Sequence, residues 1–162
     1  GAQQVGAESR WMNLTPLQSG VLWTHMELNV TNLVLPPWAV FTLLEGENDN
    51  GVRFLRLALR ADSAGAFQIR AYARDGSGSF QFSPWISLPD DTVDVDLAWN
   101  GPDGGLHLWL NDQHHPVPMT PGPYRIDRVS FGSKIQSWPG TGFAPLSSSF
   151  SIDDVTMTYD MN

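Results

Sequence analysis

The stretch that decides the fold reads Thr92-Val93-Asp94-Val95-Asp96-Leu97-Ala98-Trp99-Asn100. Every second residue from Val93 to Trp99 is apolar, and Asp94 and Asp96 lie between them. Successive side chains of a β-strand point to opposite faces of its sheet, so this alternation is typical of a strand with one buried face. It predicts that Trp99 lies in the core and that the two aspartates share the opposite face.

The same period of two recurs through most of the chain, whereas the helical period of 3.6 is nearly absent. It predicts further strands over residues 21–30, 38–45, 52–60, 66–74, 80–88, 106–111, 124–134 and 148–160. We expect Pro84 to interrupt one of them, because proline cannot donate to the hydrogen-bond ladder of a sheet. The segment from Asp112 to Pro123 holds four prolines and no pattern, so we expect it to be irregular.

The number and linkage of these strands predict the fold class. Turn sequences such as Gly101-Pro102-Asp103-Gly104-Gly105 join neighbouring strands as hairpins. Many short strands bury their inner faces by stacking in two sheets or by closing into a barrel. Uneven loops and the lack of an internal repeat favour an all-β, antiparallel two-sheet sandwich. With 162 residues, 41% of them hydrophobic, we expect a single domain over 1–162.

Composition excludes several classes of function. The chain has no cysteine, which excludes disulfides and thiolate chemistry. Its formal net charge of −8 opposes binding to phosphate backbones, so we expect no nucleic-acid partner. No apolar run approaches the roughly 18–20 residues that span a bilayer, so we expect no membrane insertion. The first residue is Gly1 rather than methionine, which suggests a mature product or an excised piece.

Several of these stretches also resemble a known superfamily. The motifs are Val93–Asn100, Gly104-Gly105 and Leu106–Asp112, followed by Ile126–Gly132 and Phe150–Val155, which fit closing strands. Over roughly two-thirds of its length the chain resembles the concanavalin-A-like lectin/glucanase superfamily, and within it the laminin-G-like domains of bacterial exported proteins. The resemblance implies a jelly roll with one concave sheet, a secreted or cell-surface location, and often a glycan-binding or adhesive role.

A group of basic and aromatic residues is the main candidate binding surface. If 52–60 and 66–74 pair as a hairpin, their polar residues fall on one face of two adjacent strands. These residues are Arg56, Arg60, Gln68, Arg70, Tyr72 and Arg74, with Phe54 beside them. Guanidinium groups suit carboxylate or sulfate, and an aromatic ring can stack on a sugar, so this face predicts a site for an acidic polysaccharide. The alternative is that acids such as Asp94 and Asp96 neutralise the arginines across neighbouring strands.

Two tryptophans and five aspartates complete the candidates. Trp109 is out of phase with its apolar neighbours, and Trp138 lies in a Gly/Pro loop, so we predict both as exposed ligand-binding aromatics. Asp94 and Asp96 are spaced for acid–base work or a metal, but outward charges that keep the sheet face soluble, or that pair with arginine on the next strand, are the favoured interpretation. Asp49, Asp153 and Asp154 offer oxygen ligands for a structural calcium ion. No other cofactor is expected.

These features predict a non-catalytic carbohydrate-binding or adhesion module. Some relatives in the superfamily are glycan hydrolases or lyases, but the hydrolase pattern Glu-x-Asp-x-x-Glu is missing, since the acidic strand reads Asp94-x-Asp96-x-Ala98. Two alternatives remain open. One is a structural interaction domain that self-associates or binds a protein through sheet edges and loops. The other is a polysaccharide lyase or hydrolase that uses Tyr, His or Asp.

Overall fold

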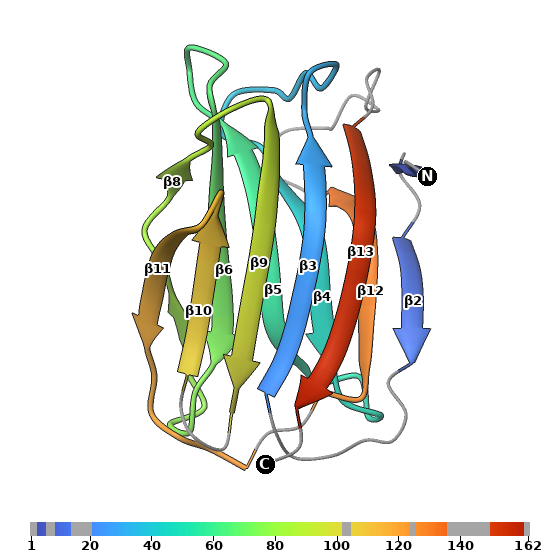
Figure 1. Ribbon diagram of the computed structural model, residues 1–162. Coiled ribbons are helices and arrows are strands. Elements are labelled where there is room, and N and C mark those ends of the chain that lie inside the picture. Colours follow the sequence, from blue (N-terminus) through green and yellow to red (C-terminus); the bar gives the residue numbers. More distant parts are fainter. Residues whose placement is uncertain are drawn as a thin grey trace.

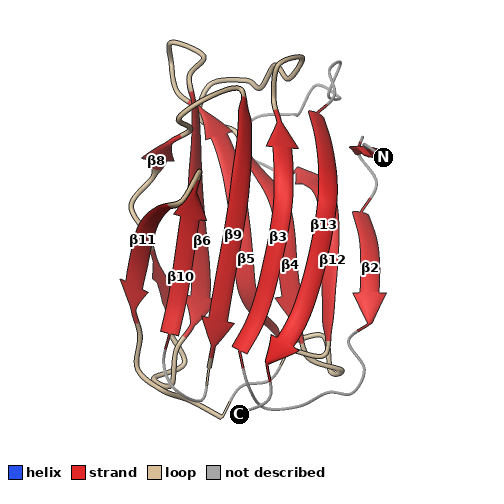
Figure 2. Cartoon of the chain, viewed as in Figure 1, coloured by secondary structure: helices blue, strands red, loops and turns tan. Residues whose placement is uncertain are grey.

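The computed structural model describes residues 3–5, 9–13, 21–101, 105–123, 126–135 and 150–160, with side chains described in 21–101, 105–123 and 126–130. Within these residues the chain forms thirteen strands and no helix (Figure 2). Accordingly, the described residues contain no helix long and apolar enough to cross a membrane.

The strands form two antiparallel sheets that lie face to face (Figure 1). The first sheet contains, in spatial order, β1 (Gln3–Val5), β13 (Phe150–Asp160), β3 (Val21–Asn29), β9 (Thr92–Asn100), β10 (Gly105–Leu110) and β11 (Gln113–Pro118). The second contains β2 (Ser9–Asn13), β12 (Arg128–Ile135), β4 (Val40–Glu47), β5 (Arg53–Ala61), β6 (Phe67–Arg74) and β7 (Phe80–Phe82), and β8 (Ile86–Ser87) also pairs with β6. The predicted all-β sandwich is confirmed.

The core lies between the sheets, where the apolar phases of the strands meet. Trp99 of β9 is 1% exposed, as its phase predicted, and Phe41 of β4 is also fully buried. Leucines from both sheets fill the space around them, and small residues such as Ala71 and Ala73 line the inner side of β6. Burying one face of each strand in this way leaves the other face of each sheet available for polar side chains.

The expectation of an irregular segment after Asp112 is wrong for its first half. Residues Gln113–Pro118 form β11, which pairs with β10 along its whole length. Asn111 and Asp112 adopt positive φ angles of 46° and 68°, as the tight two-residue turns of hairpins require. The two prolines of β11 are tolerated because β11 is an edge strand, where a missing backbone N–H need not break the sheet.

The strands β5 and β6 carry the predicted polar face in the expected register. Arg56 lies opposite Tyr72, and Arg60 lies opposite Gln68. Ala58, which is opposite Arg70, shares their phase and leaves room for the larger side chains around it. Pro84 does interrupt the next segment, which is divided into β7 and β8. Both short strands pair with β6 and so extend the same sheet.

Candidate functional site

The outer face of the second sheet brings together five of the predicted ligand-binding residues. We call the set Arg56, Arg60, Arg70, Tyr72 and Arg74 the arginine face. The first two come from β5 and the others from β6, and the antiparallel pairing of these strands sets them side by side. The inner face of the same strands is apolar and buried, so the core itself holds these polar residues outward.

Tyr72 lies between two guanidinium groups. The guanidinium carbon of Arg56 is 5.3 Å from the centroid of the Tyr72 ring, and that of Arg70 is 5.7 Å from it. Arg56 is fixed from the other side, where its Nε donates to Thr42 Oγ1 at 3.1 Å. Within the described part of the chain, the Tyr72 hydroxyl makes no hydrogen bond. It is therefore available to a ligand that lies over both arginines.

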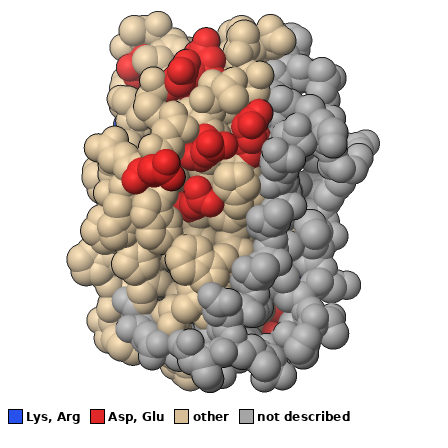
Figure 3. Space-filling view, in the orientation of Figure 1, with Lys and Arg blue, Asp and Glu red and all other residues tan. Residues whose placement is uncertain are grey.

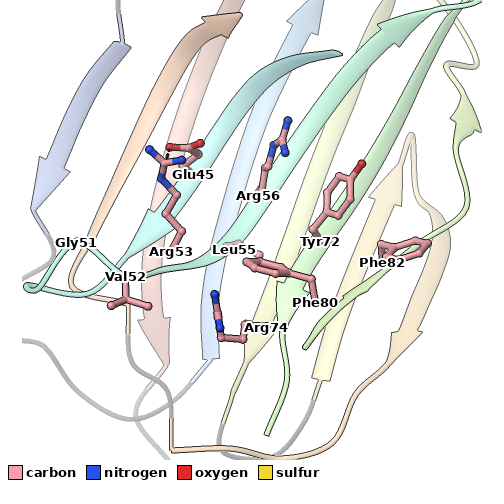
Figure 4. A pocket seen from close by; sticks show the side chains of 10 residues that line it. All are labelled: Glu45, Gly51, Val52, Arg53, Leu55, Arg56, Tyr72, Arg74, Phe80 and Phe82. Carbon is pink, nitrogen blue, oxygen red and sulfur yellow. Dashed lines mark ion pairs between the residues drawn. The ribbon is translucent and has the colours of Figure 1, made fainter. Parts of the chain in front are cut away.

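A groove of about 600 Å³ opens beside Tyr72 (Figure 4). Its lining residues are Glu45, Gly51, Val52, Arg53, Leu55, Arg56, Tyr72, Arg74, Phe80 and Phe82. Figure 4 shows Tyr72 between Arg56 and Phe82, with Arg53 beside Glu45. Aromatic rings and guanidinium groups share the groove, which suits a ligand with both apolar ring faces and negative charge.

The groove is strongly cationic. Glu45 is its single acidic lining residue, and it is paired with Arg53, whose Nε lies 3.4 Å from a Glu45 carboxylate oxygen. Burial lowers the pKa of Arg56 from its ordinary value, an effect that Tyr72 and then Glu45 oppose. Arginine nevertheless stays protonated in proteins. Because Arg56 Nη2 is buried without a hydrogen-bond partner, the groove presents a cationic donor that a bound anion can satisfy.

Three further aromatic side chains contact Arg60 and Arg70, and one of them, Phe82, also lines the groove. Arg60 lies over Trp38 and Trp85, at 4.8 and 4.2 Å from the ring centroids. Arg70 lies over the rings of Trp85 and Phe82, at 4.9 and 4.6 Å. Such cation–π contacts hold a guanidinium in place without neutralising its charge.

The paired aspartates lie on the opposite side of the molecule from the arginine face. Asp94 and Asp96 are on β9, out of phase with the buried valines of that strand, so they project from the outer face of the first sheet, where Glu27 lies opposite Asp94. Acidic side chains gather on the face of the molecule seen in Figure 3. Asp96 accepts a 2.7 Å contact from His25 Nδ1. The alternative that these two aspartates neutralise the arginines is therefore wrong, because β9 belongs to the first sheet and β5 and β6 belong to the second.

Trp109 lies on the same acidic face, as the alternation of its strand predicted. It belongs to β10 of the first sheet, whereas the arginine face belongs to the second sheet. Its ring stacks on Trp23, with centroids 5.7 Å apart, and on His114, at 4.8 Å. Trp23 lies opposite Ala98 in the register, and Trp109 lies opposite Asp96, the next outward residue of β9. Ala98 is 2% exposed although it points outward. The Trp109 ring is thus already in contact with Trp23 and His114. Trp138 lies outside the described residues.

The calcium candidates do not form a ligand cluster in the described residues. No group of three or more His, Asp or Glu side chains there could hold a metal ion. Asp49 is fixed by a hydrogen bond that its backbone N–H donates to Asp127 Oδ2 at 2.7 Å. Asp153 and Asp154 lie on β13, whose side chains are outside the described set. Calcium binding stays a prediction.

Sequence reasoning missed six residues at this face. These are Trp38, Glu45, Arg53, Phe80, Phe82 and Trp85. The alternation of Phe80 with Phe82 in β7 was a usable signal, because it matches the outward phase of a strand beside β6. No local pattern could have found Trp38, which precedes β4 and reaches Arg60 only because Pro37 pairs with Ala61 at the end of β5.

The fold and this site define a concanavalin-A-like jelly-roll β-sandwich with a cationic outer face. No protein-family model matches the sequence, and no curated protein matches it. Among solved structures, an alginate lyase from Alteromonas sp. 272 is similar, with 11% identity, 88% coverage of this chain, 73% of that chain and a TM-score of 0.60. A family 7 alginate lyase in complex with substrate (GGMG) has 12% identity, 91% and 63% coverage, and a TM-score of 0.59. A sialidase has 13% identity, 98% and 15% coverage, and a TM-score of 0.59.

These comparisons correct the functional prediction. Alginate lyases recur among the structures that share the fold, including examples from Pseudomonas aeruginosa and Zobellia galactanivorans. A non-catalytic binding or adhesion module was therefore the wrong first choice, and the expectation that the chain is not an enzyme is wrong with it. The missing hydrolase pattern misled the prediction, because a lyase does not need a pair of carboxylates. The expected jelly-roll sandwich fold is confirmed by these structures.

Proposed function

We propose that this chain is a polysaccharide lyase that cleaves an acidic, uronate-containing polysaccharide by β-elimination in the groove beside Tyr72. The observation that carries the proposal is the position of Tyr72, whose ring lies 5.3 and 5.7 Å from the guanidinium carbons of Arg56 and Arg70. The structurally similar alginate lyase in complex with its substrate supports the choice of an acidic polysaccharide. In that complex a histidine and a tyrosine of the lyase are replaced, which supports a role for a tyrosine.

The chemistry needs a cation and a proton-transfer group at one point. The base removes the proton on C5, next to the uronate carboxylate, and negative charge builds up on that carboxylate. The C5 electron pair then forms the C4–C5 double bond, the C4–O4 bond breaks, and the departing oxygen takes up a proton. Preorganised positive charge beside the carboxylate stabilises the transition state more than the ground state.

We assign these tasks to residues of the groove. Arg56 and Arg70 hold and neutralise the carboxylate of the reacting sugar, since both present guanidinium groups without an ion pair in the described part of the chain. The Tyr72 hydroxyl donates its proton to the departing O4 while its oxygen takes up the proton from C5, so the hydroxyl is restored at the end of the step. Phe82, whose ring centroid is 5.9 Å from that of Tyr72, supplies an apolar surface for the sugar ring.

The test is the release of unsaturated uronate, followed by its ultraviolet absorbance, on a panel of uronate polymers. We expect product with the unmodified chain and a loss of about 100-fold or more in kcat for Tyr72→Phe, which is typical of removing a proton-transfer group. Arg70→Gln should lower kcat and raise KM together. The matched control is Trp23→Ala on the acidic face, which should keep full activity.

The proposal fails if no polymer in the panel yields unsaturated product at high protein concentration. It also fails if Tyr72→Phe is as active as the unmodified chain. Melting temperatures of all variants are compared first, so that a loss of activity is not mistaken for unfolding.

Three finer predictions accompany this function. We propose that the chain works outside the cell or at its surface, where large acidic polysaccharides are accessible. The laminin-G-like label within the superfamily and the single domain over 1–162 also stay predictions. The first is tested by fractionating the source cells and the third by limited proteolysis, which should leave one resistant fragment.

A further inference from the structure

Trp38 has a backbone conformation that a bulky residue rarely adopts. Its φ is 64°, in the left-handed region, although it is not glycine. The conformation is held from both sides, since Trp38 N–H donates to Ala61 at 2.7 Å and Ala39 N–H donates to Pro36 at 3.1 Å. Strained residues of this kind persist where the surroundings enforce them, and they concentrate at ligand-binding positions.

The strain places an exposed indole at the far end of the arginine face. Trp38 is 39% exposed, and its ring lies 4.8 Å from the guanidinium carbon of Arg60. The same guanidinium lies 4.2 Å from the ring centroid of Trp85, so Arg60 contacts two indoles. Gln68 Oε1 accepts from Arg60 Nε at 2.8 Å and fixes the remaining edge.

Among the residues that the structure describes, this end of the face has two cations and no ion pair. Arg70 also lies over Trp85, at 4.9 Å, so that one indole contacts two guanidinium groups. Burial, and then the positive charge of Arg70, lower the pKa of Arg60 from its ordinary value. Neither arginine has an ion pair in the described residues, and Arg70 Nε is buried without a hydrogen-bond partner. Two like charges held this close favour a bound anion between or above them.

We propose that Trp38, Arg60 and Trp85 form a second subsite, which binds an acidic sugar unit of the polymer away from the reacting one, on the other side of Arg70 from the groove. Arg60 binds the carboxylate or sulfate of that unit, and the exposed indole of Trp38 packs against its ring. The inference deepens the proposed function, because it places a second contact on the same polymer chain.

The geometry gives the direction and reach of the bound polymer. Arg56 and Arg60 are four residues apart on β5, which corresponds to roughly 13 Å along the strand. A ligand that reaches both the groove and the second subsite must therefore be longer than one sugar unit and must extend along β5 and β6. Short oligomers can occupy the groove alone, so the contribution of Trp38 should depend on oligomer length.

The experiment measures binding of oligouronates of increasing length, from disaccharide to octasaccharide, by calorimetry. It uses the Tyr72→Phe background to prevent turnover, and it compares added Trp38→Ala, Trp38→Phe and Trp23→Ala. Trp23 is the matched control because it is a 38% exposed tryptophan on the opposite face. Carboxyl-reduced octasaccharide and a sulfated octasaccharide test the charge requirement and separate carboxylate from sulfate.

We expect Trp38→Ala to weaken octasaccharide binding roughly tenfold and to leave disaccharide binding unchanged. Trp38→Phe should restore most of the affinity, and Trp23→Ala should have no effect. The inference is overturned if Trp38→Ala binds the octasaccharide as tightly as the Tyr72→Phe parent, or if it weakens disaccharide and octasaccharide binding by the same factor. Full affinity for the carboxyl-reduced octasaccharide would also overturn it. Length-dependent binding without any unsaturated product from the unmodified chain would instead remove the proposed lyase function and leave this subsite intact.

Discussion

Single residues at the arginine face are held by different kinds of constraint. Tyr72 is held by stacking, between two guanidinium groups and Phe82, and its hydroxyl is left free in the described residues. Trp38 is held through its backbone N–H, which donates a hydrogen bond to the carbonyl of Ala61 at the end of β5. In both cases the functional atoms face outward because the constraint acts on another part of the residue. The consequence is a preorganised surface, which a ligand need not order on binding.

The strain at Trp38 has a direct consequence for stability. Trp38→Ala and Trp38→Gly both remove the indole, but only glycine adopts a φ of 64° without steric cost. We expect Trp38→Gly to exceed Trp38→Ala in unfolding free energy by about 1 kcal/mol, as measured by urea denaturation. Equal stability of the two variants would contradict a strained backbone at this position.

At the level of elements, the hairpin of β5 and β6 positions the site, and its sequence predicted this well. The alternation placed Arg56, Arg60, Arg70 and Tyr72 on one face, because the period of a strand is fixed by its backbone. What alternation cannot specify is which sheets lie opposite each other. It therefore did not reveal that Asp94 and Asp96 project from the other sheet, since sheet membership of β9 depends on pairing with β3 and β10.

Other elements escaped prediction for physical reasons of their own. The edge strand β11 carries two prolines, which hide the period-two pattern, and its pairing partner β10 decides its conformation. The aromatic contacts of Arg60 come from segments distant in sequence, around Trp38 and Trp85, which only tertiary structure brings together. The functional prediction failed for a similar reason, since it rested on a carboxylate motif within one strand.

The outer face of β10 and β11 should make stability depend on pH. Burial first, and the neighbouring imidazole of His114 second, lower the pKa of His107 from its ordinary value. His107 Nδ1 lies 2.8 Å from His114 Nε2, so the pair shares one hydrogen bond. The folded state binds the His107 proton more weakly than the unfolded chain does. Unfolding free energy should therefore fall as the pH drops through the ordinary histidine range, about 6.5, towards the lower folded value.

The variant His107→Gln tests this dependence. It removes the titrating group, so its stability should fall less steeply between neutral and mildly acidic pH than that of the unmodified chain, by thermal denaturation across that range. His25→Gln on the same sheet controls for the loss of any imidazole. Parallel pH profiles for His107→Gln and the unmodified chain would show that His107 does not cause the effect.

At the scale of the whole molecule, charge is separated between two outer faces. The first sheet exposes Glu27, Asp94 and Asp96, whereas the second exposes the arginine face. A net charge of −8 opposes the approach of a polyanion in general, so the cationic groove must provide the local attraction. The acidic outer face of the first sheet repels a polyanion, so it also disfavours binding of the polymer to that sheet.

This separation gives a salt dependence with a definite sign. Raising the ionic strength from about 0.1 M to about 1 M shortens the screening length from about 10 Å to about 3 Å. We expect affinity for an acidic octasaccharide to fall over this range, since attraction by the arginines dominates at short distance. A neutral octasaccharide serves as the control. Affinity that is constant or rises with salt would mean that the arginines do not bind the carboxylates.

The most direct measurement is a crystal structure of Tyr72→Phe soaked with an acidic oligosaccharide. We expect the ligand over β5 and β6, with one carboxylate between Arg56 and Arg70 and the position of Tyr72 beside the bond to be cleaved. A ligand bound over Trp23 and Trp109 on the other sheet, with the groove empty, would contradict the central claim that the arginine face is the active surface.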